Sequence, residues 1–249
     1  MITESFDCLT PPVMKLEDFY GEKKQLLRIC MPIFSREIYD LILRSHPCEI
    51  IAEIGAANGH TPVYRFSREG KEIAFYLSPI GSAMAAQFCI EANWLTGADH
   101  FILFGSAGSL DREATAGKFI VPTEAYRDEG MSYHYAPAAD YIPIRNHGRV
   151  SALFRSLGVP FVEGRVWTTD AFLRETVGQM KKRRQEGCIA VEMELAGVQA
   201  VCDFYGFELY DFLAAGDVLS EASYEVEGLH DANHNPDKLQ LALALAESL

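Results

Sequence analysis

The sequence predicts an α/β domain with a largely parallel sheet that helices cover on both faces. Apolar segments of strand length alternate with segments of helical periodicity, which is the order of elements that gives such a sheet. The run FILF at 101–104 is apolar throughout, as expected of a strand buried on both faces. The 249 residues contain no repeat, low-complexity tract or linker, so we expect one domain, 1–249, in which residues 1–25 form an extension of uncertain role.

Periodicity and capping residues place the elements of the first half of the chain. The segment 82–95 is the clearest helix, because its apolar residues recur at three- and four-residue steps and Ser82 can cap its N-terminus. In chain order we expect a strand at 26–31, a helix at 35–43 with Ser35 as its cap, strands at 49–54 and 72–77 that pair as a hairpin around the polar segment 55–71, the helix at 82–95, and the strand at 101–104.

The second half continues this alternation and brings polar residues to the ends of strands. We expect strands at 119–121, 164–167, 189–191 and 209–214, a helix from about 193 to 205, and a final amphipathic helix at 236–249. In such sheets ligands bind at the carboxyl ends of the strands. Three strand ends carry informative residues: Gly105-Ser106, Glu192-Met193-Glu194 and Gly216-Asp217. Their convergence predicts a ligand site.

Composition and charge argue against several classes of function. Acidic residues number 35 against 22 basic ones, and the net charge of −13 disfavours binding to nucleic acids or to anionic membrane surfaces. No apolar run reaches the roughly 20 residues of a membrane-spanning helix, and the N-terminus lacks the pattern of a signal peptide. We therefore expect a cytoplasmic protein with six reduced cysteines, and no metal site because the seven histidines form no ligand pattern.

The segment GSAGSL, residues 105–110, is a candidate for binding an anion. Glycine lets backbone N–H groups approach a ligand closely, and the hydroxyl of Ser106 is a further donor next to Gly105. The alternative is a tight turn that simply follows a strand. The segment is neither a P-loop nor a dinucleotide-binding fingerprint, because GK[ST] and GxGxxG are both absent.

Carboxyl and aromatic side chains are the other candidates. Glu194 lies among apolar residues in VEMELA, so it either accepts hydrogen bonds from a ligand such as a sugar or benefits from the dipole at a helix N-terminus. Asp217 follows an apolar strand, where it can donate a proton or serve as a turn or capping residue. Phe172 can stack on a flat heterocycle or pack in its loop, and Arg174 can bind a base or pair with Glu175.

Four segments, taken in order, resemble the nucleoside phosphorylase family, which includes hexameric purine nucleoside phosphorylases, uridine phosphorylases and methylthioadenosine/S-adenosylhomocysteine nucleosidases. They are GSAGSL, GKFIVPTEAYRDEGMSYHY (117–135), VEMELAGVQAVCDFYGFE (191–208) and AAGDVLS (214–220). The resemblance runs from about Arg28 to the C-terminus. It implies a three-layer α/β/α sandwich around a mixed central sheet, with a homodimer as the building unit or a hexamer formed as a trimer of dimers.

The resemblance also implies a role for each candidate. Glu194 would hold the ribose hydroxyls, Met193 would pack against the sugar, Phe172 would stack on the base with Arg174 beside it, Asp217 would donate a proton to a purine ring nitrogen, and Ser106 with the backbone of Gly105 would hold phosphate. The sugar becomes cationic and the departing base becomes anionic as the glycosidic bond breaks, so a carboxylate and an acid suit these two positions.

Two departures from the family pattern concern phosphate. Phosphorylases of this family usually carry an arginine two residues before the GS of the first segment, where this chain has Leu103. The early GDPxR phosphate loop is also absent, and Arg36 in MPIFSR is the nearest counterpart of its arginine. Loss of bidentate arginines weakens phosphate binding, and the nucleosidases of the family use water instead.

We therefore expect a pentosyltransferase of purine salvage. It would cleave the N-glycosidic bond of a nucleoside, a purine one rather than a pyrimidine one, with phosphate to give free base and pentose 1-phosphate. Phosphate is then a co-substrate, and no cofactor is expected. The alternatives are a nucleosidase that uses water, which Leu103 favours, and a nucleoside-binding protein without catalysis, against which Glu194 and Asp217 argue.

Overall fold

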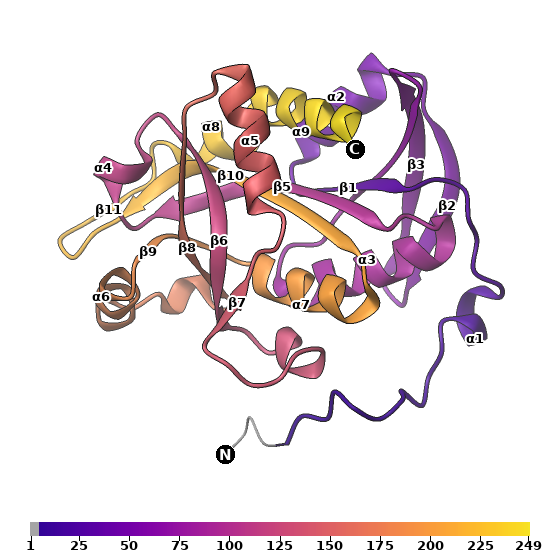
Figure 1. Cartoon of the computed structure of the whole chain (residues 1–249), viewed down its shortest axis with the longest axis horizontal. Helices are drawn as coiled ribbons and strands as arrows, with labels where there is room; N and C mark the ends of the chain where they lie inside the picture. The colour runs from indigo at the N-terminus through magenta and orange to yellow at the C-terminus, as the bar shows by residue number, and fades with distance from the viewer. Residues whose placement is uncertain (1–4) are drawn as a thin grey trace.

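The computed structural model describes residues 5–249 as three layers, with helices on both sides of one mixed sheet (Figure 1). Residues 1–4 of the N-terminal extension lie outside the described residues. In chain order the elements are α1 (Glu17–Tyr20), β1 (Ile29–Ile33), α2 (Arg36–Ser45), β2 (Glu49–Ala56), β3 (Gly59–Arg68), β4 (Lys71–Leu77), α3 (Ser82–Thr96), β5 (His100–Ser109), α4 (Arg112–Thr115), β6 (Phe119–Asp128), η2 (Met131–His134), β7 (Tyr141–Pro143), α5 (His147–Leu157), β8 (Phe161–Thr169), η3 (Phe172–Arg174), α6 (Val177–Gln185), β9 (Cys188–Glu192), α7 (Leu195–Tyr205), β10 (Glu208–Leu219), β11 (Tyr224–Glu225), α8 (Leu229–His234) and α9 (Pro236–Ser248). The α/β/α sandwich with a mixed sheet is confirmed.

Parallel pairs form the centre of the sheet and antiparallel pairs surround them. Strand β1 pairs in parallel with β4 and β5, β5 pairs in parallel with β10, and β8 pairs in parallel with β6 and β9. The pairs β5–β9 and β6–β10 are antiparallel, so β5, β10, β6, β8 and β9 close into a circuit. The prediction of a largely parallel sheet therefore holds only for the centre, because the edge strands β2, β3 and β4 form an antiparallel meander.

Each face of the sheet covers its own hydrophobic core. On one face α3 and α7 pack against side chains such as Phe101 and Leu213, and on the other α2, α5 and α9 pack against Ile102, Phe104 and Phe212 (Figure 1). Neighbouring residues of one strand thus enter different cores, because successive side chains of a strand point to opposite faces. The predicted burial of FILF on both faces is confirmed.

The predicted hairpin of 49–54 with 72–77 is wrong, because a third strand lies between them. The polar segment 55–71 contains β3, which pairs with β2 on one side and with β4 on the other. Only Val63 and Phe66 of β3 are buried, so this strand, which lies next to the edge strand β2, keeps a largely polar sequence. The tight connection from β3 to β4 uses Glu69 and Gly70, both with positive φ.

Two strands continue through the glycines that were predicted to end them. Strand β5 includes Gly105 and Ser106, and β10 includes Gly216 and Asp217. Parallel pairing between the two strands extends past these positions, with Gly105 opposite Leu213 and Ser106 opposite Ala214. The anion-binding candidate is consequently strand backbone and not a turn.

The helices begin close to the predicted positions, with one error in capping. Ser35 caps α2, its hydroxyl accepting a hydrogen bond from the N–H of Ile38 at 3.2 Å. Ser82 does not cap α3: it is the first helical residue, and its hydroxyl donates to Glu129 at 3.1 Å. None of the helices in residues 5–249 is long and apolar enough to cross a membrane.

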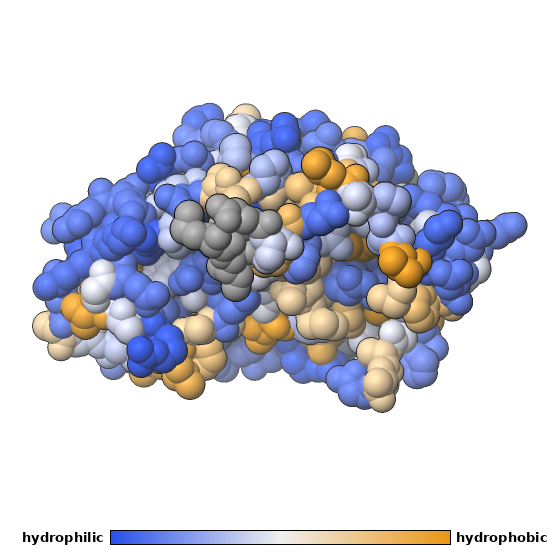
Figure 2. Space-filling model, turned by 90° about the horizontal axis from the view of Figure 1, so that it is seen from below, coloured by the Kyte–Doolittle hydropathy of each residue, from blue (hydrophilic) through white to orange (hydrophobic). Residues whose placement is uncertain are grey.

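Residues 5–25 of the N-terminal extension run along the outside of the body (Figure 1). Several of their apolar side chains are exposed to solvent. Tyr20 anchors it, donating a hydrogen bond to Glu91 at 2.5 Å and accepting one from the N–H of Gly55 at 3.0 Å. Leu9 and Val13 are 91% and 98% exposed. Figure 2 shows the lower face of the molecule, where apolar patches are separated by hydrophilic surface.

Candidate active site

A cavity of about 760 Å³ opens where β5, β9 and β10 meet α8 and the segment around η3. It brings together six of the predicted site residues: Gly105, Ser106, Phe172, Met193, Glu194 and Asp217. Arg36 and Arg174 do not line it. Both arginines are exposed, and the Arg36 guanidinium lies 5.1 Å from the centre of the Tyr39 ring.

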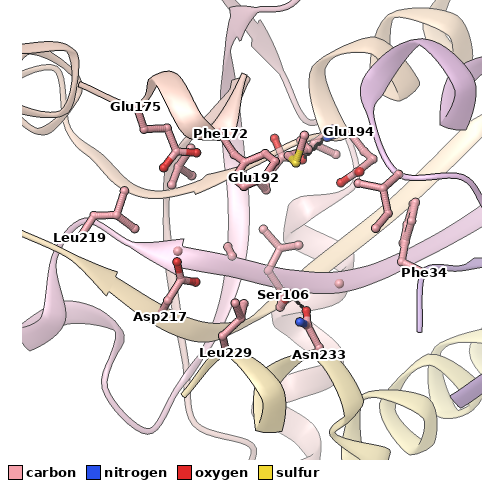
Figure 3. Close-up of a pocket in the computed structure, with 18 of the residues that line it drawn as sticks. Phe34, Ser106, Phe172, Glu175, Glu192, Glu194, Asp217, Leu219, Leu229 and Asn233 are labelled. Carbon is pink, nitrogen blue, oxygen red and sulfur yellow. Dashed lines mark hydrogen bonds between the residues drawn. The ribbon is translucent and has the colours of Figure 1, made fainter. Parts of the chain in front are cut away.

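One end of the cavity holds two carboxyl groups that face each other, Glu175 and Asp217, which we call the carboxyl pair (Figure 3). Glu175 follows η3, and Asp217 lies near the end of β10. Burial, and then the charge of Asp217, raises the pKa of Glu175 to about 7. Phe172 lies beside the pair and is 57% exposed, so its ring is free to contact a ligand (Figure 3). This end can therefore offer an aromatic face together with a proton donor and an acceptor.

The carboxylates Glu192 and Glu194 form the middle of the cavity wall (Figure 3). Glu192 is held by hydrogen bonds from the hydroxyl of Thr168 and from the N–H groups of Glu194 and Leu195, the last two at 2.7 Å each. Glu194 accepts a hydrogen bond from the N–H of Gly81 at 2.7 Å. Burial raises the pKa of Glu192 to about 7. Burial and the charge of Glu192 raise the pKa of Glu194 to about 8.

The segment 127–135, which carried part of the resemblance, supports Glu194 from outside the cavity. Its Glu129 accepts hydrogen bonds from the hydroxyl of Ser82 and from the N–H of Ser132. Ser82 in turn lies against α7, where a side chain on Gly197 would place Cβ 2.1 Å from the Ser82 hydroxyl. Helices α3 and α7 can approach this closely only because position 197 is glycine. The contact fixes Gly81, and with it the hydrogen bond to Glu194.

A third buried carboxyl, Asp211, lines the same cavity next to Leu103. The two residues are register partners on β10 and β5. Asp211 is 3% exposed, and its Oδ2 has no hydrogen-bond partner among the described residues. Burial and the nearby Glu192 and Glu194 raise its pKa well above the ordinary range. At the position where phosphorylases usually have an arginine, this chain therefore has an apolar side chain beside an acid.

The remaining wall is polar and contains a lysine, and we call it the polar corner: Ser35, Ser106, Asn233, His234 and Lys238. Ser106 donates a hydrogen bond to the side-chain oxygen of Asn233, and Ser35 lies 2.8 Å from Nδ1 of His234 (Figure 3). Nζ of Lys238 donates to the carbonyl oxygens of Gly105 at 3.1 Å and Asn233 at 3.2 Å. Helix α9 thus brings a donor to the carbonyl oxygen of Gly105, and α8 brings an acceptor to the hydroxyl of Ser106.

Sequence reasoning missed Glu175, Asp211 and Lys238. The sequence contained a signal for Asp211: it is an acid inside the apolar strand LYDFLAA, and burying a carboxyl group without a partner is energetically costly. Glu175 was considered only as an ion-pair partner of Arg174, and Lys238 had the appearance of a solvated residue in an amphipathic helix. Within residues 5–249 no group of three or more His, Cys, Asp or Glu side chains is arranged to hold a metal ion.

Comparisons with known proteins agree on one family. The sequence model of the family described as the phosphorylase superfamily matches residues 39–247. A DeoD-type purine nucleoside phosphorylase of an Exiguobacterium species is 23% identical over 174 residues, which cover 69% of this chain and 72% of the relative. A DeoD-type enzyme of Bacillus cereus is 24% identical over 162 residues, covering 64% of this chain and 67% of the relative.

Solved structures with the same fold include enzymes of other named activities. A futalosine hydrolase mutant of Helicobacter pylori has a TM-score of 0.71 at 19% identity, covering 90% of this chain and 100% of that one. The 5'-methylthioadenosine/S-adenosyl homocysteine nucleosidase of the same organism has a TM-score of 0.70 at 18% identity, covering 91% of this chain and 100% of that one.

Proposed function

The chain belongs to the phosphorylase superfamily, and on this premise we propose that it cleaves the N-glycosidic bond of a purine nucleoside by phosphorolysis. The products are free base and pentose 1-phosphate. The observation that carries the proposal is the arrangement of groups around one cavity: the aromatic ring and the carboxyl pair lie at one end, and Glu194 and the polar corner lie on opposite walls. A nucleoside with its base at the carboxyl pair would place its sugar between Glu194 and the wall from which the nucleophile attacks.

The carboxyl pair receives the base. Phe172 stacks on the heterocycle, and Asp217 donates a proton to a ring nitrogen as the C1'–N bond breaks and its electron pair moves to the base. Glu175 contacts the exocyclic group at the same edge, and its pKa of about 7 lets it either donate or accept a hydrogen bond near neutral pH. A purine offers both ring nitrogens and an exocyclic group to such a pair.

The middle of the cavity receives the sugar. Glu194 accepts hydrogen bonds from the ribose hydroxyls, and Met193 packs against the ring. Hydrogen bonding to a carboxylate favours its ionised form, so a bound ribose lowers the raised pKa of Glu194. The ionised group then stabilises the positive charge that develops on the sugar. A phosphate oxygen held at Ser106 forms the new bond to C1', and solvent returns a proton from the hydrogen phosphate to Asp217.

Hydrolysis is the second candidate, and Asp211 with Leu103 is the observation that favours it. A carboxyl without a protein partner beside an apolar residue suits a water molecule better than a dianion. In that case the water oxygen forms the bond to C1', the proton of the water passes to the ionised form of Glu192 or Glu194, and Asp217 protonates the departing base. The products are free base and free sugar.

The decisive experiment incubates the purified protein with a panel of purine and pyrimidine nucleosides, with and without phosphate, and identifies products by mass spectrometry. Pentose 1-phosphate that forms only with phosphate supports phosphorolysis. Free sugar formed at the same rate in both buffers establishes hydrolysis instead. Nucleoside binding without release of base under any condition contradicts the proposal.

A further inference from the structure

Lys238 is a buried cation without an anionic partner. Lys238 is 1% exposed, and its ammonium group forms no ion pair among the described residues. Burial alone lowers the pKa of its ammonium group to about 8, so most molecules still carry the charge at pH 7. Lysine is almost never fully buried unless it is paired, because removing a charge from water is costly. The position therefore calls for a compensating anion.

The hydrogen bonds of Lys238 leave room for such an anion. An ammonium group has three N–H donors, and two of them reach the carbonyl oxygens of Gly105 and Asn233. The third has no acceptor among the described residues, and Lys238 lines the cavity. A methionine would fill the same space in the wall without burying charge, so packing alone gives no reason for a lysine here.

The surroundings of Lys238 favour an oxyanion over other ligands. Ser106 and Ser35 contribute hydroxyls, and Asn233 and His234 contribute an amide and an imidazole, all on the same wall of the cavity. On the neighbouring helix α2, the carboxylate of Glu37 lies 3.9 Å from Nε2 of His234. Glu192 and Glu194 lie on the opposite wall from Ser106 and Asn233 (Figure 3).

We propose that Lys238 supplies the positive charge of an oxyanion subsite in the polar corner, and that its ligand is inorganic phosphate. The subsite rests on the proposed function, in which phosphate attacks C1' from the wall that contains Ser106. A cation from the C-terminal helix α9 thereby takes the part that an arginine at position 103 would otherwise have. Phosphate completes the third hydrogen bond of the ammonium group and neutralises its charge.

The test measures phosphate binding in the absence of nucleoside, by calorimetry in a chloride buffer, for the wild type, Lys238→Met and Lys24→Met. Lys24 is exposed and does not line the cavity, so Lys24→Met removes the same charge elsewhere. Loss of a charge-assisted contact should weaken binding by about 10- to 100-fold in Lys238→Met, and binding to Lys24→Met should be unchanged. Equal binding by all three proteins, or no binding by the wild type at millimolar phosphate, overturns the inference.

A pH series with sulfate covers the case in which Lys238→Met does not fold. Sulfate keeps the same charge between pH 7 and 9.5, and ordinary histidine and carboxylate groups have finished titrating by about pH 7.5. Because the pKa of Glu194 is about 8 and that of Asp211 is also raised, the series is run on the wild type, Glu194→Gln and Asp211→Asn. Stabilisation by sulfate in thermal unfolding should fall through pH 8 in all three proteins as Lys238 loses its proton. A constant effect of sulfate across this range contradicts a lysine-centred subsite.

A parallel titration with a nucleoside 5'-monophosphate separates free phosphate from a phosphate ester. Binding of the ester at this lysine without binding of inorganic phosphate overturns the assignment of the ligand. The two proposals also fail separately. If base is released without phosphate, the chain cleaves the glycosidic bond but the phosphate subsite is contradicted. If phosphate binds but no nucleoside is cleaved, the subsite is supported and the proposed function is contradicted.

Discussion

The carboxyl pair and the polar corner differ in the charged groups that they hold: the first has two acids, and the second has one cation. At the carboxyl pair two acids face each other, and the pKa of Glu175 rises so that a proton is retained near neutral pH. At the polar corner a single ammonium group is surrounded by carbonyls, hydroxyls and an amide, and no anion among the described residues matches it. The first region is suited to exchange protons with a ligand, and the second is suited to bind a negative charge.

The two regions therefore have different roles in the proposed reaction within one cavity. Substitutions at the carboxyl pair should alter the chemical step and the choice of base at any phosphate concentration. Substitutions in the polar corner should alter the dependence on phosphate and leave the choice of base unchanged.

The largest effect is expected for Asp217→Asn. An amide cannot donate a proton to the leaving base with the strength of a carboxylic acid, so kcat for purine nucleosides should fall by about 10²- to 10⁴-fold with little change in KM. Steady-state kinetics with inosine and adenosine measure this effect. A nucleoside whose leaving group needs no protonation is the control and should lose much less. An unchanged kcat would remove Asp217 from the mechanism.

Glu194→Gln tests the carboxylate between the two regions. Loss of a charged hydrogen bond to the sugar should lower kcat/KM by about 10- to 100-fold. Because the pKa of Glu194 is raised to about 8, the wild-type kcat/KM should increase between pH 6 and 8 as this group ionises, and the variant should lack that increase. The pH profiles of the two proteins, measured on one nucleoside, check the assignment. Parallel profiles would contradict it.

Ser106→Ala tests the polar corner with a smaller change. The substitution removes one hydroxyl next to the proposed phosphate position, so KM for phosphate should rise by about 3- to 10-fold while KM for the nucleoside stays the same. Initial rates over a grid of both substrate concentrations separate the two constants. An effect on nucleoside KM alone would place Ser106 at the sugar.

The smallest effect concerns stability and Glu175. Its pKa in the folded protein, about 7, is above the ordinary value of 4.5, so the folded state binds a proton more tightly than the unfolded state does. The free energy of unfolding should therefore decrease as pH rises from about 4.5 to 7, and Glu175→Gln should flatten this decrease. Urea unfolding at a series of pH values measures the difference, with Glu227→Gln at an exposed position as the control. A profile that is the same for Glu175→Gln and wild type would mean that burial and the charge of Asp217 do not raise the pKa of Glu175 in the folded protein.

Sequence reasoning found the residues whose neighbours in the chain already make them unusual. Glu194 and Asp217 are acids in apolar surroundings, and both line the cavity. Ser35 was predicted to cap a helix from its position, and it does so. Arg36 was selected as the nearest counterpart of the family's phosphate-loop arginine, and Arg174 was selected because it lies beside Phe172 in the chain. Neither lines the cavity, because an exposed arginine looks the same in sequence as one that binds a ligand.

Strand boundaries were less predictable, because the end of a strand depends on its partner. Glycine weakens a strand taken alone, yet β5 continues through Gly105 because β10 provides hydrogen-bond partners alongside. The polar segment that contains β3 lacks strong strand character, and it is a strand because β2 and β4 pair with it on both sides. Such partners are distant in the chain and leave no local pattern.

The sequence by itself determined the α/β class, the order of most elements, and three residues of the candidate site, namely Glu194, Asp217 and Phe172. It did so because apolar periodicity and an acid among apolar residues are local features. Only the tertiary structure decided that Glu175 faces Asp217, that Asp211 lies beside Leu103, and that Lys238 is buried against Gly105. The pKa of a side chain and its access to a ligand depend on what packs around it, and that environment exists only once separate elements of the chain meet.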